Sequence, residues 1–175
     1  IVGPTGMGKS VLVAMMAMQF RRYRGSRIFA FDVGRSIRAA TLGLGGEHYD
    51  LGADGDIAFQ PLARIDDEGY RTWAADWVEG RLIREGVAVG PDEKAAIWSA
   101  LESLAGAPVA QRTMTGLSVL LQSNALRQAL SPYVLGGAHG KLLDADHDRL
   151  GMADVQCFEM EELMASPAAV RSVLG

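Results

Sequence analysis

Gly3-Pro4-Thr5-Gly6-Met7-Gly8-Lys9-Ser10, near the start of this 175-residue chain, determines the class of fold that we expect. It matches the pattern G-x-x-x-x-G-K-[S/T] at every fixed position, and a chance match in a chain this long is on the order of 1%. The glycines let the backbone wrap a phosphate so that several N–H groups point inward. A helix beginning near Lys9 adds the positive end of its dipole. The motif therefore predicts a nucleotide-phosphate site.

Each part of this loop has a predicted role. Lys9 reaches the β- and γ-phosphates and is the predicted catalytic residue, and the Ser10 hydroxyl is the predicted Mg²⁺ ligand. The residues expected to bind nucleotide are Gly3, Thr5, Gly6, Met7, Gly8, Lys9 and Ser10. The cofactors that this set predicts are ATP and Mg²⁺.

The composition is that of an ordinary globular protein, with 49% apolar and 22% charged residues. The net charge of -4 argues against a protein whose whole surface binds nucleic acid, although a local basic patch stays open. Cys157 is the only cysteine, so no disulfide forms within one chain, and a reducing, cytoplasmic setting fits. No apolar run approaches the roughly 20 residues that span a bilayer, so we expect membrane contact only through partners.

The first part of the chain alternates helix and strand patterns. A helix is predicted to follow the loop through Phe20, and consecutive apolar residues predict a strand over 27–32, buried on both faces. A short helix is expected over 36–44, then strands over 47–51 and 57–59. This order implies a parallel sheet. Because the chain opens inside the motif, we interpret it as a fragment whose sheet is incomplete.

The middle of the chain changes to helical spacing throughout. Four helices are predicted, over 70–82, 91–104, 116–122 and 124–130. Strand-like segments return at 141–143 and 155–160, and a last helix begins near Glu161. We therefore expect three parts: a first part of an α/β core over 1–65, a helical insert over 66–133, and a return to the core over 134–175.

Asp32 ends an apolar run that resembles a Walker B strand, whose aspartate holds Mg²⁺ through water. It lies on the first strand after the loop, however, and Val33 stands where a catalytic glutamate often follows. We expect Asp32 to shape the rim of the cleft instead. The segments ending at Asp144 and Glu159 are too short or interrupted by glutamine. The Walker B strand is therefore expected outside this chain.

Other polar clusters carry weaker signals. Asp144, Asp146 and Asp148 imitate the start of a calcium loop, but the glycine and the final glutamate of that loop are missing, so a solvated turn is expected. The three histidines have no ligand spacing. The remaining signals each leave two interpretations open: Trp73 and Trp77 for packing or partner docking, and Arg21, Arg22 and Arg24 for the helix dipole or for contact with DNA or a neighbouring subunit.

Several longer strings resemble one family over nearly the whole chain: GPTGMGKS, FAFDVGRS, HYDLG, FQPLARIDDEG, TGLSVLLQS and LGGAHGKLLDADHDRLGMADVQCFEMEEL. They resemble the TrbE-type conjugal-transfer ATPases of type IV secretion systems. Val33 departs from that pattern, which has lysine at this position. The resemblance implies a RecA-like P-loop NTPase core with an inserted helical subdomain. It also implies that the Walker B Asp-Glu pair and an arginine finger lie beyond the chain.

The resemblance further implies ATP hydrolysis coupled to type IV secretion and pilus assembly. It implies a homo-oligomeric ring that meets other secretion components at the inner membrane, with DNA contact left open. Alone, this piece is expected not to hydrolyse ATP. Two other functions remain: a DNA-translocating ATPase of the coupling-protein type, and a nucleotide-binding regulatory module without hydrolysis. A small-molecule kinase is disfavoured because no arginine-rich lid segment is evident.

Overall fold

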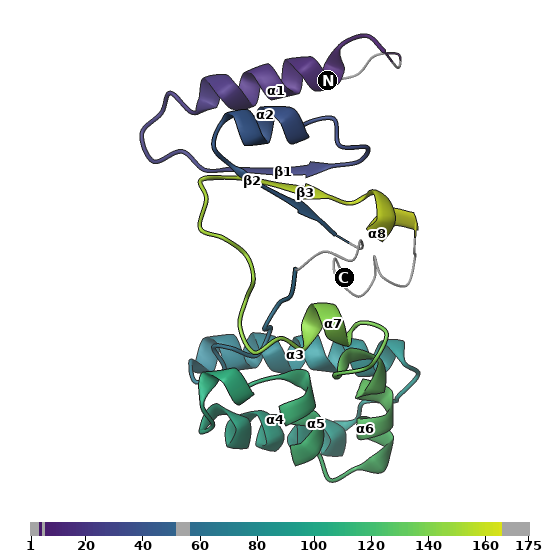
Figure 1. Cartoon of the computed structure of the whole chain (residues 1–175). Coiled ribbons are helices and arrows are strands. Elements are labelled where there is room, and N and C mark those ends of the chain that lie inside the picture. The colour runs from purple at the N-terminus through teal and green to yellow at the C-terminus, as the bar shows by residue number, and fades with distance from the viewer. Residues whose placement is uncertain (1–3, 5, 52–56, 166–175) are drawn as a thin grey trace. The chain divides into compact units, whose positions relative to one another are not determined.

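The computed structural model describes residue 4 and residues 6–51 and 57–165. The chain forms two compact units, and each is treated by itself: Ile1–Ile57 with Gly151–Gly175, and Ala58–Leu150. The first is an α/β unit and the second is a helical unit (Figure 1). None of the helices in the described part of the chain is long and apolar enough to cross a membrane.

The α/β unit is built on a small parallel sheet. Its strands are β1 (Ile28–Asp32), β2 (Glu47–Asp50) and β3 (Val155–Glu159), in the order β1-β3-β2. Both neighbouring pairs are parallel, with Phe31 and Tyr49 each opposite Phe158. The central strand therefore comes from the segment that follows the helical unit in sequence. The predicted α/β class is confirmed.

The two faces of the sheet are covered unequally. All five residues of β3 are buried, as expected for a central strand. In β1, by contrast, Phe29 and Phe31 are 55% and 61% exposed, so the prediction of a strand buried on both faces is wrong. β1 lies at an edge of the described sheet, where its outward side chains lack a covering layer among the described elements. Phe31 stacks on Phe158, with ring centroids 5.4 Å apart.

Three helices belong to this unit: α1 (Lys9–Phe20), α2 (Arg38–Gly43) and α8 (Glu161–Ala165). α2 packs against β2 and β3 and buries Thr41. α1 buries none of its residues, and Val11 and Met16 are 63% and 58% exposed. Among its apolar residues Ala14 and Ala17 are half-buried, and the larger apolar side chains are exposed in the described part of this unit.

The helical unit contains the elements that the middle of the sequence predicted, with shifted ends. They are α3 (Glu68–Arg84), α4 (Pro91–Ala105), η1 (Val109–Gln111), α5 (Met114–Leu120), α6 (Asn124–Leu130), η2 (Ser131–Tyr133) and α7 (Gly140–Leu143). The buried side chains of these elements and of the segment before α3 form one core, which includes Leu62, Val78, Leu101, Leu117 and Tyr133. Side-chain caps begin several of the helices: Asp67 accepts from the Tyr70 N–H at 2.8 Å and starts α3.

Two predicted strands are wrong. Residues 141–143 belong to the short helix α7, and residues 57–59 form an irregular segment. The backbone of 57–59 does make hydrogen bonds, from the Phe59 N–H to the Leu142 carbonyl at 2.7 Å and from the Arg149 N–H to the Ala58 carbonyl at 2.9 Å. Because its partner is a turn of helix and a loop, the segment satisfies its polar groups without forming a ladder.

The three aspartates of the apparent calcium loop have separate duties. Asp144 accepts from the Thr115 N–H at 2.8 Å, and Asp148 accepts from the Gln60 N–H at 2.7 Å. Asp146 is exposed, as expected in a solvated turn. Among the residues that the structure describes, no group of acidic, histidine or cysteine side chains is placed to hold a metal ion. Two of these aspartates therefore accept hydrogen bonds from backbone N–H groups elsewhere in the helical unit.

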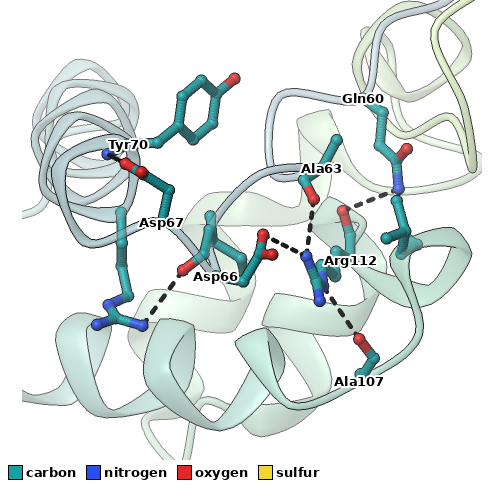
Figure 2. Close-up of polar contacts among 10 residues, drawn as sticks. Gln60, Ala63, Asp66, Asp67, Tyr70, Ala107 and Arg112 are labelled. Carbon is teal, nitrogen blue, oxygen red and sulfur yellow. Dashed lines mark hydrogen bonds and ion pairs between the residues drawn. The ribbon is translucent and has the colours of Figure 1, made fainter.

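A buried arginine joins two parts of the helical unit (Figure 2). Arg112 donates from Nε to the Ala107 carbonyl at 3.0 Å and from Nη1 to the Ala63 carbonyl at 3.0 Å. The same Nη1 pairs with Asp66 at 2.6 Å, where the Asp66 side chain is 63% exposed. Gln60, also buried, donates to the Val109 carbonyl. The segment before α3 is thereby fastened to the connection between α4 and α5.

Candidate nucleotide-phosphate site

The described part of the glycine loop has the backbone that its sequence requires. Gly6 and Gly8 have φ angles of 83° and 74°, in the left-handed region that L-residues seldom adopt. A Cβ built on either glycine would meet no atom within 4 Å. The need for glycine therefore comes from the backbone conformation and not from crowding. Gly3 and Thr5, also expected to bind nucleotide, lie outside the described residues.

The loop leads directly into the amino end of α1. Gly8 is the residue before the helix, and no side chain in the described part of the chain caps this end. The first turn also contains no acidic residue. Uncapped N–H groups at a helix start, together with the helix dipole, favour an anion at this position.

The two polar side chains of the site lie in this first turn. The Lys9 ammonium donates to the Pro4 carbonyl, which holds it over the loop. Ser10 is exposed, so its hydroxyl is open to solvent. Met7 is 73% exposed, so its part in the predicted site is that of its backbone and not of its side chain. The described residues of the predicted set are therefore together at one end of α1.

The carboxyl ends of the strands lie beside the candidate phosphate site. In Figure 1 these ends of β1 and β3 lie at the same end of the α/β unit as the start of α1. Ligands of parallel α/β sheets bind at this edge. Two carboxylates end these strands, Asp32 on β1 and Glu159 on β3, and they lie opposite each other in the ladder.

The carboxylate of Asp32 accepts hydrogen bonds from the loop that follows β1. It accepts from the Val33 N–H at 3.0 Å, the Ser36 hydroxyl at 2.7 Å and the Ile37 N–H at 2.8 Å. This is the pattern of an aspartate that shapes a turn. These three contacts of Asp32 therefore fit a rim-shaping role.

Glu159 is a feature that the sequence reasoning did not assign. Its side chain is fully buried, at 0% exposed, and its two oxygens accept from the N–H groups of Gly34 at 3.0 Å and Arg35 at 2.5 Å. The Glu161 N–H donates to it as well, at 2.9 Å. The available signal in the sequence is an acidic residue that ends an apolar strand, a pattern that Walker B strands share.

Arg35 is a second residue to which the sequence pattern assigned no role. It is the non-glycine residue with positive φ in the described chain, at 55°, and it follows Gly34, whose φ is 86°. Its guanidinium pairs with Asp50 at the end of β2, with Nη2 and Oδ2 2.8 Å apart. The hydrogen bond and the charge of Asp50 raise the pKa of Arg35 above its usual value.

The parallel sheet defines an α/β protein, and the left-handed glycines and the uncapped start of α1 make the carboxyl edge of its sheet a candidate anion site. No protein-family model matches the chain. Individual proteins do match, and they identify it more closely. The chain is homologous over nearly its whole length to a segment of the TrbE conjugal-transfer proteins, so the resemblance seen in its sequence is confirmed.

Two TrbE proteins give this result. A probable conjugal transfer protein TrbE of Sinorhizobium fredii is 41% identical over 169 residues, covering 94% of this chain and 25% of that protein. The conjugal transfer protein TrbE of Rhizobium radiobacter is 42% identical over 94% of this chain and 21% of that protein. The chain thus spans a quarter or less of these relatives.

More distant similarity reaches the VirB4 proteins. The type IV secretion system protein virB4 of Bartonella henselae is 24% identical over 87% of this chain and 20% of that protein. The solved structure of VirB4 of Thermoanaerobacter pseudethanolicus has a TM-score of 0.69 and 19% identity, covering 96% of this chain and 51% of that chain. At this identity the structural match shows a shared fold.

Proposed function

We propose that the chain is the ATP-binding part of a P-loop ATPase that energises conjugative transfer, type IV secretion and pilus assembly. The observation that carries this proposal is the loop ending at Ser10, where Gly6 and Gly8 are left-handed and α1 begins without a cap. The relatives named as conjugal transfer and type IV secretion proteins supply the biological context.

Within this proposal the residues of the loop have distinct tasks. The N–H groups at the start of α1 surround the phosphates, and the Lys9 ammonium exchanges the Pro4 carbonyl for β- and γ-phosphate oxygens. A bound Mg²⁺ neutralises phosphate charge, and the exposed Ser10 hydroxyl is the group that fits it here. Gly3 and Thr5 complete the expected loop.

In this proposal two catalytic groups come from outside the chain. We place the carboxylate that polarises the attacking water and the arginine finger outside it, in further sequence or in a neighbouring copy. The predicted ring of identical subunits and the other secretion components at the inner membrane are the partners. Apolar side chains are exposed over the length of α1, and this exposure supports the proposal that the helix is buried in a larger assembly.

The test compares the full-length protein with its Lys9→Ala variant and measures nucleotide binding and ATP hydrolysis by each. We expect the parent protein to release phosphate from Mg-ATP and the variant to lose turnover, because Lys9 contacts the transferred phosphate. Equal turnover in both would refute the site. Turnover that rises several-fold on adding DNA would favour a DNA-translocating ATPase instead. Binding without turnover in the full-length protein would favour a regulatory module.

A further inference from the structure

The loop over 33–37, between β1 and α2, turns its backbone donors inward. Two carboxylates take them: Asp32 at the end of β1 and Glu159 at the end of β3. The donors are the N–H groups of Val33, Gly34, Arg35 and Ile37 and the hydroxyl of Ser36. These donors are engaged within the unit, whereas the guanidinium of Arg35 reaches outside the loop and pairs with Asp50 at the end of β2.

The backbone of this loop gives no reason for an arginine at position 35. Successive backbone N–H groups in a turn can form a concavity that binds anions, and here the Glu159 carboxylate accepts from those of Gly34 and Arg35. Glycine adopts that conformation without strain, whereas an L-residue is strained in it. A strained residue that its surroundings hold firmly is a candidate for a functional role.

The ion pair with Asp50 does not offset this strain. The Arg35 side chain is 48% exposed, and ion pairs at such exposure contribute little to stability because water screens them. Asp50 itself is poorly satisfied, since its Oδ1 is buried without a hydrogen-bond partner. The pair thus holds the guanidinium in place at the carboxyl edge, but it does not explain the choice of residue.

We propose that Arg35 binds the terminal phosphate of the nucleotide and that Glu159 is its positioning residue. The guanidinium exchanges Asp50 for γ-phosphate oxygens, to which its planar fork of donors is suited. Its location supports this, because the loop follows β1 at the edge of the sheet where ligands of such sheets bind. The inference rests on the proposed ATP function and extends the site beyond the glycine loop.

The experiment measures the affinity of the full-length protein for Mg-ATPγS and for Mg-ADP by calorimetry. Arg35→Gly is the main variant, because it removes the guanidinium and also the backbone strain. We expect it to weaken ATPγS binding roughly tenfold or more, with much less effect on ADP, while the melting temperature stays level or rises. Arg38→Gln is the matched control, since it removes an exposed positive charge three positions away.

Two further variants test the exchange of Asp50 for phosphate by Arg35 and the positioning of Arg35 by Glu159. Asp50→Asn weakens the competing ion pair, so it should tighten ATPγS binding severalfold. Glu159→Gln should lower the preference for ATPγS over ADP in the parent protein but leave that ratio unchanged when Arg35→Gly is also present. A structural role alone would weaken both nucleotides in both backgrounds.

Several results would overturn the inference. These are unchanged ATPγS binding by Arg35→Gly, equal weakening of both nucleotides, or a loss equal to that of Arg38→Gln. Lys9→Ala separates the two proposals. If Lys9→Ala loses affinity and Arg35→Gly does not, only the present inference fails. If Lys9→Ala binds ATPγS as tightly as the parent, the phosphate site itself is misplaced and both fail.

Discussion

Replacing Arg112 with methionine tests how the helical unit is held together. Methionine keeps much of the length of the side chain but donates no hydrogen bond, so the carbonyls of Ala63 and Ala107 each lose a donor at 3.0 Å. A partly buried polar group left unpaired costs about 1–3 kcal/mol. Because both alanines are only half-buried, water can replace part of the lost bonding, and we expect Arg112→Met to lower the free energy of unfolding by about 2–4 kcal/mol.

The matched control is Asp66→Asn, which changes the charged partner of the same guanidinium. The Asp66 side chain is 63% exposed, so this loss should stay below about 1 kcal/mol. Urea unfolding followed by tryptophan fluorescence reports on the helical unit specifically, because Trp73, Trp77 and Trp98 all lie in it. An Arg112→Met effect no larger than that of Asp66→Asn would refute the role given to the two carbonyl contacts.

Four further outcomes are expected. The isolated 175-residue chain should bind Mg-ATP weakly and release no phosphate, and turnover equal to that of the full-length protein, lost on Lys9→Ala, would show a complete site here. Gly8→Ala should weaken ATP binding by straining a residue at φ 74°, which equilibrium titration measures. Burial, and then the Glu85 contact, raises the pKa of Tyr133 above 10.0, so its contribution to stability is present below that pH and is lost as pH rises. Tyr133→Phe should flatten this alkaline decline in unfolding experiments, and an unchanged pH profile would contradict it. Thr113→Ala should cost about 1 kcal/mol of stability, because Thr113 accepts from the Gly116 N–H at the start of α5, and an unchanged urea midpoint would count against the cap.

Local signals predicted the helices well because those signals lie within a few residues of each other. Helical spacing placed α3 and α4, and the Ser131-Pro132 break correctly ended α6. The short apolar runs at 57–59 and 141–143 failed for a physical reason. A run of three residues does not distinguish strand from helix or irregular backbone, and here the two runs meet each other instead of joining a sheet.

The site divides in the same way. The glycine loop is readable from sequence, because its chemistry needs fixed residue types at fixed spacing. The contribution of Glu159 to the loop around Arg35 is not, since the two residues come from opposite sides of the helical unit in sequence. Only the pairing of β1 with β3 brings them together.

The order of the strands has a consequence for how the chain folds during synthesis. β1 and β2 do not pair with each other, and each waits for β3, which leaves the ribosome after the helical unit. The helical unit has its own core, and helices that are neighbours in sequence pack on each other, so it can fold first. In the meantime Phe29, Phe31 and the apolar side chains of α1 stay exposed on an unpaired nascent segment, where chaperone binding or association between nascent chains would act.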